Sequence, residues 1–239
     1  MIIPGRGNFY PLIVNLPYKA LEAECEYDQL HSPENTFKGY FIGKLYHYKD
    51  ECLDVLIYKL NYTSKKKDKN FPFLMERHLY FGSENFTRES EIGPAIRNGT
   101  LTIGFIGLAE CLVVLIGKHH GESDVSQELG VSLVKHIYSR YVVKSEEMKL
   151  NFTLMSEPAE SAAGRLLRCT RKEFGVVPGV TEHEFLTNSH HIPVYYKISF
   201  TYKVFKEAPY HKYESIWLVI WSALNPINAF QRGFVYIHI

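Results

Sequence analysis

The residues most able to do chemistry are a pair of adjacent histidines and a run of lysines. His119, His120 and Glu122 offer nitrogen and oxygen atoms of the kind that bind metal ions. Adjacent histidines on a helix point to different faces, and the spacing supplies no further ligand, so we expect a half-exposed pair at a helix end. The basic run at 65–69 could bind phosphate or nucleic acid, but we expect a solvated loop after a helix.

The histidine pair ends the longest apolar stretch of the chain, residues 98–123. An Asn-Gly turn opens this stretch. Residues 100–105 then have the β-branched composition of a strand, and residues 107–117 are apolar on every face, as in a buried helix. Glu110 argues against a membrane span, because a charge at the bilayer centre costs about 3 kcal/mol. A buried strand that leads directly into a buried helix is typical of an α/β domain.

The composition is that of a globular protein with balanced charge. The 239 residues are 46% apolar, enough for a sizeable core, and their formal net charge is +1. This balance favours neither nucleic acid nor an acidic membrane as a partner. The four cysteines form no CxxC pair and the first residues lack the pattern of a signal peptide. We therefore expect no metal site, no redox dithiol and a cytoplasmic location.

Periodicity and turn signals divide the rest of the chain into alternating helices and strands. Turn-forming residues also mark loops at 174–181 and 187–193. This alternation predicts an α/β fold with a parallel or mixed sheet covered by helices. We expect helices at 18–30, 37–62 and 124–149, a further helix opened by Glu157-Pro158-Ala159-Glu160, and strands at 12–16, 151–155 and 194–200.

Several motifs together resemble one enzyme family, the anaerobic (class III) ribonucleoside-triphosphate reductases. The resemblance covers about residues 5–211 and is specific because many unrelated motifs occur in the family's order. The motifs are Gly5-Arg6-Gly7-Asn8 with Asn15-Leu16-Pro17, NGTLTIGFIGLAE at 98–110, GKHHGES at 117–123, LNFTLMSEPAE at 150–160, Gly164-Arg165, FGVVPGVT at 174–181, TNSHHIPVYYKIS at 187–199 and EAPYH at 207–211.

The resemblance implies a fold and a reaction. The family fold is a ten-stranded α/β barrel in which a finger loop carries a cysteine to the centre. A glycyl radical, generated by an iron–sulfur activating enzyme that uses S-adenosylmethionine, passes to that cysteine. The thiyl radical abstracts the ribose 3′-hydrogen of a ribonucleoside triphosphate, and the 2′-hydroxyl leaves as water. Formate or a dithiol supplies the reducing equivalents. The family also has a structural zinc, expected outside this chain, and we allow for a homodimer.

The resemblance also points to a phosphate site at the start of one helix. The helix that opens at Pro158 resembles the family's phosphate-binding helix, whose free N–H groups and dipole favour an anion. Glu160 lies in its first turn, and Ser161 and Arg165 would add a hydroxyl and a cation. The alternative is an ordinary first-turn acid and a surface arginine. The family usually has threonine, a better helix cap and anion donor, where this chain has Glu157.

Five further polar residues are candidates by the same resemblance. Asn188, Ser189 and His191 precede a predicted strand and could hydrogen-bond a ribose or a base. Asn8 and Asn15 flank a short predicted strand, where family asparagines position substrate or formate, and Asn8 is a weak catalytic candidate. The alternative in each case is the ordinary use of these residues in turns and at strand ends.

The resemblance assigns residues 1–211 to a partial reductase barrel domain, whereas the apolar segment 212–239 matches nothing in the family. A radical-cysteine loop, a glycyl-radical segment and a four-cysteine zinc site have no counterpart in the 239 residues. We therefore expect the chain alone to be inactive, and deoxynucleotide formation under strict anoxia with the activating enzyme would refute this. Two alternatives stay open: a piece of a split reductase completed by a partner chain, and a non-catalytic nucleotide-binding remnant.

Overall fold

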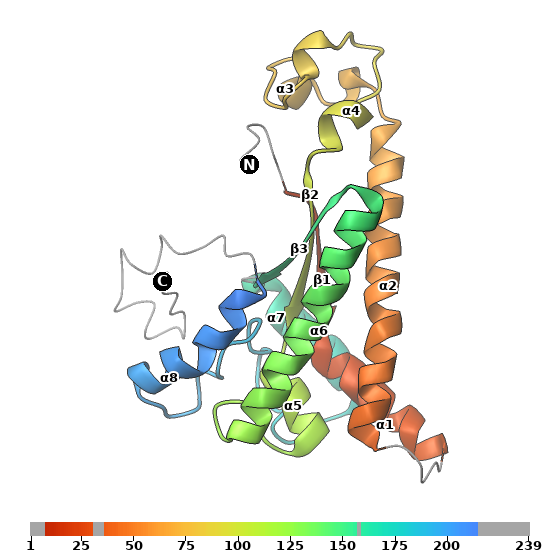
Figure 1. Ribbon diagram of the computed structural model, residues 1–239. Coiled ribbons are helices and arrows are strands. Elements are labelled where there is room, and N and C mark those ends of the chain that lie inside the picture. Colours follow the sequence, from red (N-terminus) through yellow and green to blue (C-terminus); the bar gives the residue numbers. More distant parts are fainter. Residues whose placement is uncertain (1–7, 31–35, 157–158, 215–239) are drawn as a thin grey trace. The chain divides into compact units, whose positions relative to one another are not determined.

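The structure is a computed structural model that describes residues 8–30, 36–156 and 159–214, without the side chain of Glu160. The chain forms two units, which Figure 1 shows coloured along the sequence. Each unit combines segments that are distant in the sequence. Unit 1 is Met1–Leu12, His47–Ile103 and Ser139–Thr153, and unit 2 is Ile13–Tyr46, Gly104–Tyr138 and Leu154–Ile239.

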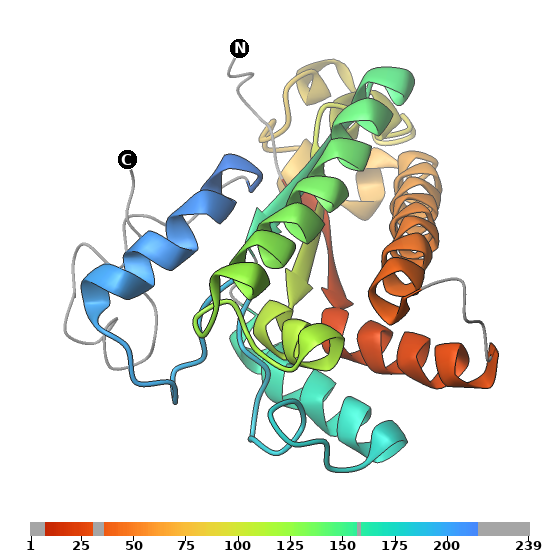
Figure 2. The ribbon, with the colours of Figure 1, turned by 60° about the horizontal axis from the view of Figure 1, so that its bottom comes forward.

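Three strand–helix pairs form the framework of the chain. The strands make one sheet in the order β1-β2-β3, and the arrows of β1 and β2 point the same way in Figure 2. The central strand is buried along almost its whole length, as expected for a parallel sheet with both faces covered. The pairs are β1 (Asn8–Asn15) with α1 (Leu16–Leu30), β2 (Thr100–Ile106) with α5 (Leu108–Ile116), and β3 (Asn151–Ser156) with α7 (Glu160–Phe174).

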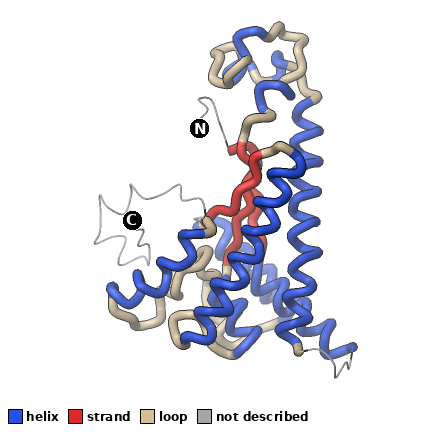
Figure 3. Tube along the Cα trace, in the orientation of Figure 1, coloured by secondary structure: helices blue, strands red, loops and turns tan. Residues whose placement is uncertain are grey.

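Helices make up most of the remaining described structure, as the blue segments of Figure 3 show. Two of them are long, and the others are short and lie between the long helices and strands or near the end of the described chain. They are α2 (Phe37–Ser64), α6 (Asp124–Met148), η1 (Asp68–Asn70), α3 (Pro72–Met75), η2 (Ser83–Asn85), α4 (Gly93–Ile96), α8 (Phe200–Glu207) and η3 (Ala208–Lys212). No helix in the described ranges is long and apolar enough to cross a membrane.

The predicted strand at 194–200 is wrong. Residues up to Ser199 form a loop, and α8 begins at Phe200. Val194 and Tyr195 are 47% and 44% exposed, so the apolar side chains that suggested a strand pack against no sheet. The amide of Tyr196 instead donates to the carbonyl of Pro193 in a turn, at 3.0 Å. The helix cap at Ser199, which accepts from the Tyr202 amide, then fixes the start of α8.

Other predicted elements are confirmed, with small changes at their ends. The helices expected at 37–62, 107–117 and 124–149 correspond to α2, α5 and α6, and the strands at 100–105 and 151–155 correspond to β2 and β3. The strand expected at 12–16 is β1, which begins at Asn8 and ends at Asn15, and the helix expected from residue 18 already begins at Leu16, with Pro17 in its first turn. Proline is well accommodated there, since first-turn N–H groups have no partner within the helix. Pro158 lies outside the described residues.

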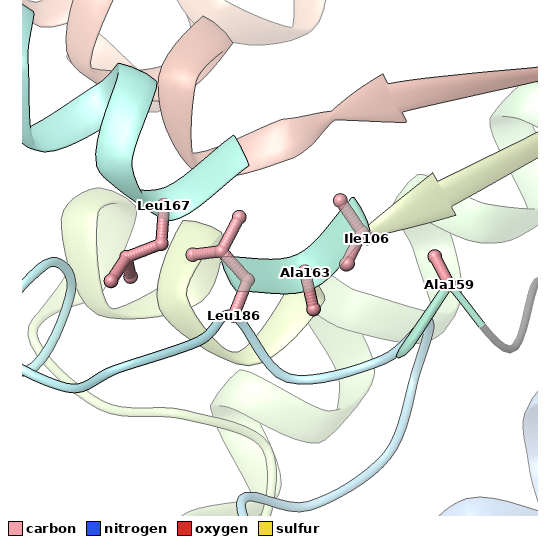
Figure 4. Close-up of a cluster of buried hydrophobic side chains, with 5 residues drawn as sticks. All are labelled: Ile106, Ala159, Ala163, Leu167 and Leu186. Carbon is pink, nitrogen blue, oxygen red and sulfur yellow. The ribbon is translucent and has the colours of Figure 1, made fainter. Parts of the chain in front are cut away.

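An apolar cluster in unit 2 joins the end of β2 to the start of α7. Figure 4 shows its side chains, which come from β2, from α7 and its N-cap residue, and from the loop that follows α7. All are at most 6% exposed, so this contact is part of the core. The cluster therefore fixes the first turn of α7 beside the loop around residue 186. Its members are Ile106, Ala159, Ala163, Leu167 and Leu186.

Candidate functional site

The first turn of α7 offers backbone donors to an anion. α7 begins at Glu160, and its N-cap residue is Ala159, which has no side-chain oxygen that could accept from the first amides. The amide of Ala163 donates to the carbonyl of Ala159 at 2.8 Å, as in the first turn of a helix. The N–H groups at the start of a helix have no intrahelical partner, and the helix dipole adds positive potential there.

Two of the predicted phosphate-binding residues lie on one exposed face of this helix. Ser161 and Arg165 are four residues apart and both are exposed to solvent. Their hydroxyl and guanidinium groups are therefore accessible to a ligand at the N-terminal end of α7. Glu160 contributes a first-turn amide, while its side chain and the whole of Glu157 lie outside the described structure.

A polar loop, residues 186–191, lies between α7 and the end of β2. The amide of Leu186 donates to the Ala163 carbonyl of α7 at 3.4 Å, and the amide of Gly107, directly after β2, donates to the Thr187 carbonyl at 2.8 Å. Ile106 and Asn188 form an isolated antiparallel bridge. The structure thus brings the predicted residues of this loop and those of α7 to the same end of β2.

Asn188 is the best-placed ligand-binding side chain of this loop. Its Oδ1 atom is buried and has no hydrogen-bond partner among the described residues. A buried carbonyl oxygen without a partner costs roughly 1–3 kcal/mol, which a donor on a ligand would recover. Ser189 is 1% exposed and adopts a positive φ of 44°, and its contact with a ribose or a base stays a prediction.

A buried glutamate pins the polar loop to α5. The Oε1 atom of Glu110 accepts from the amide of Thr187 at 2.8 Å and from its hydroxyl at 2.7 Å. Glu110 is 1% exposed. Burial raises the pKa of Glu110, and the two hydrogen bonds from Thr187 oppose that rise. Glu110, whose charge argued against a membrane span, therefore anchors the polar loop to α5. The sequence pattern did not reveal this role.

His191 faces α8. It is 3% exposed, and its Nδ1 atom lies 3.1 Å from Oε2 of Glu207. The amide of Ile192 donates to the other oxygen of Glu207 at 2.8 Å, and Lys203 lies 3.6 Å from that same oxygen. Burial alone would raise the pKa of Glu207, but the charges of His191 and Lys203 hold it at about 2. His191 therefore positions the loop through α8, and contact with a nucleotide stays a prediction.

Asn15 and Asn8 each have a partner within their own unit. Asn15 accepts from the amide of Tyr18 at 3.2 Å and donates to Oγ1 of Thr170 at 3.0 Å, so it caps α1 and links it to α7. Asn8, in unit 1, accepts from the hydroxyl of Thr102 at 2.8 Å. The structure assigns these contacts to both asparagines, and their role toward substrate or formate stays a prediction.

The expected half-exposed histidine pair is wrong, because both histidines are buried. His119 is 6% exposed and His120 is 0% exposed. The Nδ1 atom of His119 accepts from the Gly121 amide at 3.0 Å, and Glu122 accepts from the His119 amide at 2.8 Å. Burial lowers the pKa of His120 to about 3. These contacts indicate a structural turn after α5.

The lysine run at 65–69 pairs with acids of its own region. Lys69 lies 2.6 Å from Glu89, and Lys67 lies 3.9 Å from Glu91 and forms an isolated bridge with it. Exposed ion pairs of this kind contribute little to stability. The lysines are exposed or half-exposed as expected, but residues 68–70 form the short helix η1, and Asp68 is 3% exposed.

The strand–helix pairs and the polar loop at the end of β2 define an α/β protein with a candidate anion site at one helix start. The family model described as "Anaerobic ribonucleoside-triphosphate reductase" matches residues 2–216. The chain therefore belongs to the anaerobic ribonucleoside-triphosphate reductase family, which confirms the resemblance seen in its motifs.

Individual relatives agree with this family. The anaerobic ribonucleoside-triphosphate reductase of Escherichia coli (strain K12) is 31% identical over 212 residues, which are 86% of this chain and 28% of the relative. The enzyme of Enterobacteria phage T4 is 26% identical over 212 residues, or 88% of this chain and 32% of the relative. This chain thus spans less than a third of the length of either relative.

A solved structure shows the same fold. The anaerobic ribonucleotide reductase from Thermotoga maritima in complex with dATP and CTP is 18% identical, with a TM-score of 0.66, over 88% of this chain and 31% of that chain. The likeness supports the predicted α/β class. The described residues form a three-stranded sheet, and the predicted ten-stranded barrel is not shown.

Proposed function

We propose that this chain carries the part of an anaerobic ribonucleoside-triphosphate reductase that holds the triphosphate and the ribose of a nucleotide. The observation that supports this most strongly is the meeting of two features at the end of β2: the first turn of α7, and the buried, unpartnered Oδ1 atom of Asn188. Both occur within the segment that matches the family.

Four of the predicted residues have distinct roles in this proposal. Phosphate oxygens accept from the first amides of α7, including that of Glu160, and from the hydroxyl of Ser161. The guanidinium of Arg165 neutralises phosphate charge from the exposed face of the helix. Asn188 accepts from a ribose hydroxyl through Oδ1. Glu110 positions the loop and touches no ligand.

The reaction belongs, in this proposal, to the complete enzyme: reduction of a ribonucleoside triphosphate to the deoxyribonucleotide with loss of the 2′-hydroxyl as water. We infer that β1, β2 and β3 are part of a ten-stranded barrel. We also infer that a glycyl radical, made by an iron–sulfur activating enzyme, supplies the radical. The support for these details is family membership. The described residues carry binding and positioning, and no radical step is assigned to them.

Replacing Arg165 with alanine is expected to weaken binding of a ribonucleoside triphosphate about tenfold, because a charge-assisted hydrogen bond contributes about 1.5 kcal/mol. The measurement is a calorimetric titration of the 239-residue chain with CTP and ATP. Arg168→Ala is the matched control, since Arg168 is exposed on the same helix but lies almost a turn further from its start. Equal weakening by both substitutions, or by neither, would contradict the proposed site.

A further inference from the structure

Three potential metal ligands meet in unit 2, one of them in the polar loop of the proposed nucleotide site. His190 lies near the end of the polar loop, His211 lies in η3, and Glu214 follows η3. One ligand atom from each lies within 4.8 Å of the others. The side chains of His190 and Glu214 are completely buried, and His211 is half-buried. The three ligands thus join η3 and the segment after it to the polar loop.

Polar atoms of these residues lack hydrogen-bond partners among the described residues. They include Nε2 of His190, Oε1 of Glu214 and Nδ1 of His211. Nδ1 of His190 and Oε2 of Glu214 lie 2.7 Å apart and pair with each other as ions. Buried polar atoms are nearly always paired, so this concentration of unpaired atoms requires an explanation. A cation between the three residues would provide a partner for each of them.

An ion pair between His190 and Glu214 alone does not account for the cluster. It would leave Nε2 of His190 and Nδ1 of His211 without partners, although both atoms are buried. Aromatic packing orients the two histidines instead. The ring of Tyr210 stacks on His190 at 5.0 Å between centroids, and His211 packs edge-on against His190 at 5.1 Å.

We propose that His190, His211 and Glu214 bind one divalent transition-metal ion of the Zn²⁺ class. Two imidazole nitrogens and one carboxylate oxygen are the ligands such ions prefer, whereas Ca²⁺ and Mg²⁺ prefer oxygen ligands. Three protein ligands leave one position of a tetrahedral ion for water or another small ligand. The site shares the polar loop with the proposed nucleotide site but uses different side chains of it. His211 and Glu214 are three residues apart, but His190 lies more than 20 residues earlier, so no spacing rule indicates the site.

Titration of the metal-free chain with Co²⁺ tests this proposal. Visible absorption bands of a bound, low-symmetry Co²⁺ ion are expected to saturate at one ion per chain, and Zn²⁺ should displace it. Glu214→Gln keeps the shape of the side chain and removes the anionic ligand. His211→Ala removes the imidazole ligand that is half-buried. Each is expected to weaken binding at least about 100-fold, since losing even an outer-shell partner costs 10–100-fold. His47→Ala is the control, because His47 is exposed on α2.

Three results would overturn the proposal. They are the absence of saturable Co²⁺ and Zn²⁺ binding by the wild-type chain, unchanged affinity in Glu214→Gln, and equal weakening in the His47→Ala control. X-ray absorption of the Zn²⁺-loaded wild-type chain gives an answer that does not depend on the folding of any variant. It should show imidazole and oxygen ligands, and a sulfur ligand from one of the four cysteines would also overturn the assignment.

Discussion

Replacing Gly107 with alanine is expected to destabilise the chain by about 3 kcal/mol. Gly107 is the N-cap of α5 and has a φ of 78°, a conformation that costs an alanine about 1 kcal/mol. A Cβ atom there would also lie 2.5 Å from Cδ and 2.7 Å from Cγ of Pro17. The proline ring is part of the α1 backbone and cannot rotate away, so α1 and α5 would have to separate. Overpacking of this kind typically costs about 1–3 kcal/mol more.

Gly117 provides the matched control at the other end of the same helix. Its φ is 77°, and a Cβ atom there would meet nothing within 4 Å. Gly117→Ala is therefore expected to cost only the conformational term, about 1 kcal/mol. Urea denaturation of both variants, followed by circular dichroism, measures the difference. Equal losses of stability would show that the contact between Gly107 and Pro17 is not as close as described.

Replacing Glu110 with alanine is expected to cost a similar amount, about 3 kcal/mol, and to release the polar loop. The substitution leaves the amide and the hydroxyl of Thr187 buried without an acceptor, at roughly 1–3 kcal/mol each. Removal of a buried carboxyl group offsets part of this cost. Hydrogen exchange should also become faster in the loop around Asn188. A variant with unchanged stability and unchanged loop exchange would contradict the anchoring role.

Glu110→Gln separates the hydrogen bonds from the charge, because the amide oxygen still accepts from Thr187. We expect it to cost less than about 1 kcal/mol at acidic pH. Burial raises the pKa of Glu110 above its ordinary 4.5. The folded state therefore binds more protons than the unfolded state above pH 4.5, and wild-type stability falls as pH rises towards the folded pKa. Over that range the wild type should lose stability relative to the Glu110→Gln variant as the pH rises. A shift the other way would refute the raised pKa.

The parts of the fold that the sequence predicted correctly are those set by local pattern. Residues 100–117 contain a β-branched segment followed by a helix between two glycines, and the structure has β2 and α5 there. The segment 194–200 has a similarly apolar composition but pairs with no strand among the described residues, and α8 begins within it. Strand formation depends on a partner from elsewhere in the chain, which local composition does not specify.

Only those residues of the candidate site that belong to family motifs, or directly follow one, could be predicted from the sequence. The family motifs identified Ser161, Arg165 and Asn188, which the structure brings to one end of β2. The anchor between Glu110 and Thr187 joins residues 77 positions apart, and no spacing rule connects them. The burial of His119 and His120 likewise depends on distant aromatic rings, those of Tyr196 and Tyr210.

Hydrogen exchange of the 239-residue chain with and without saturating CTP tests the central claim most directly. Binding of the triphosphate at the start of α7 and of the ribose at Asn188 should slow amide exchange in residues 160–165 and 186–191. Residues 68–92, which belong to unit 1, should exchange at an unchanged rate. Protection confined to residues outside α7 and the polar loop, or no protection by any ribonucleoside triphosphate, would contradict the proposed function.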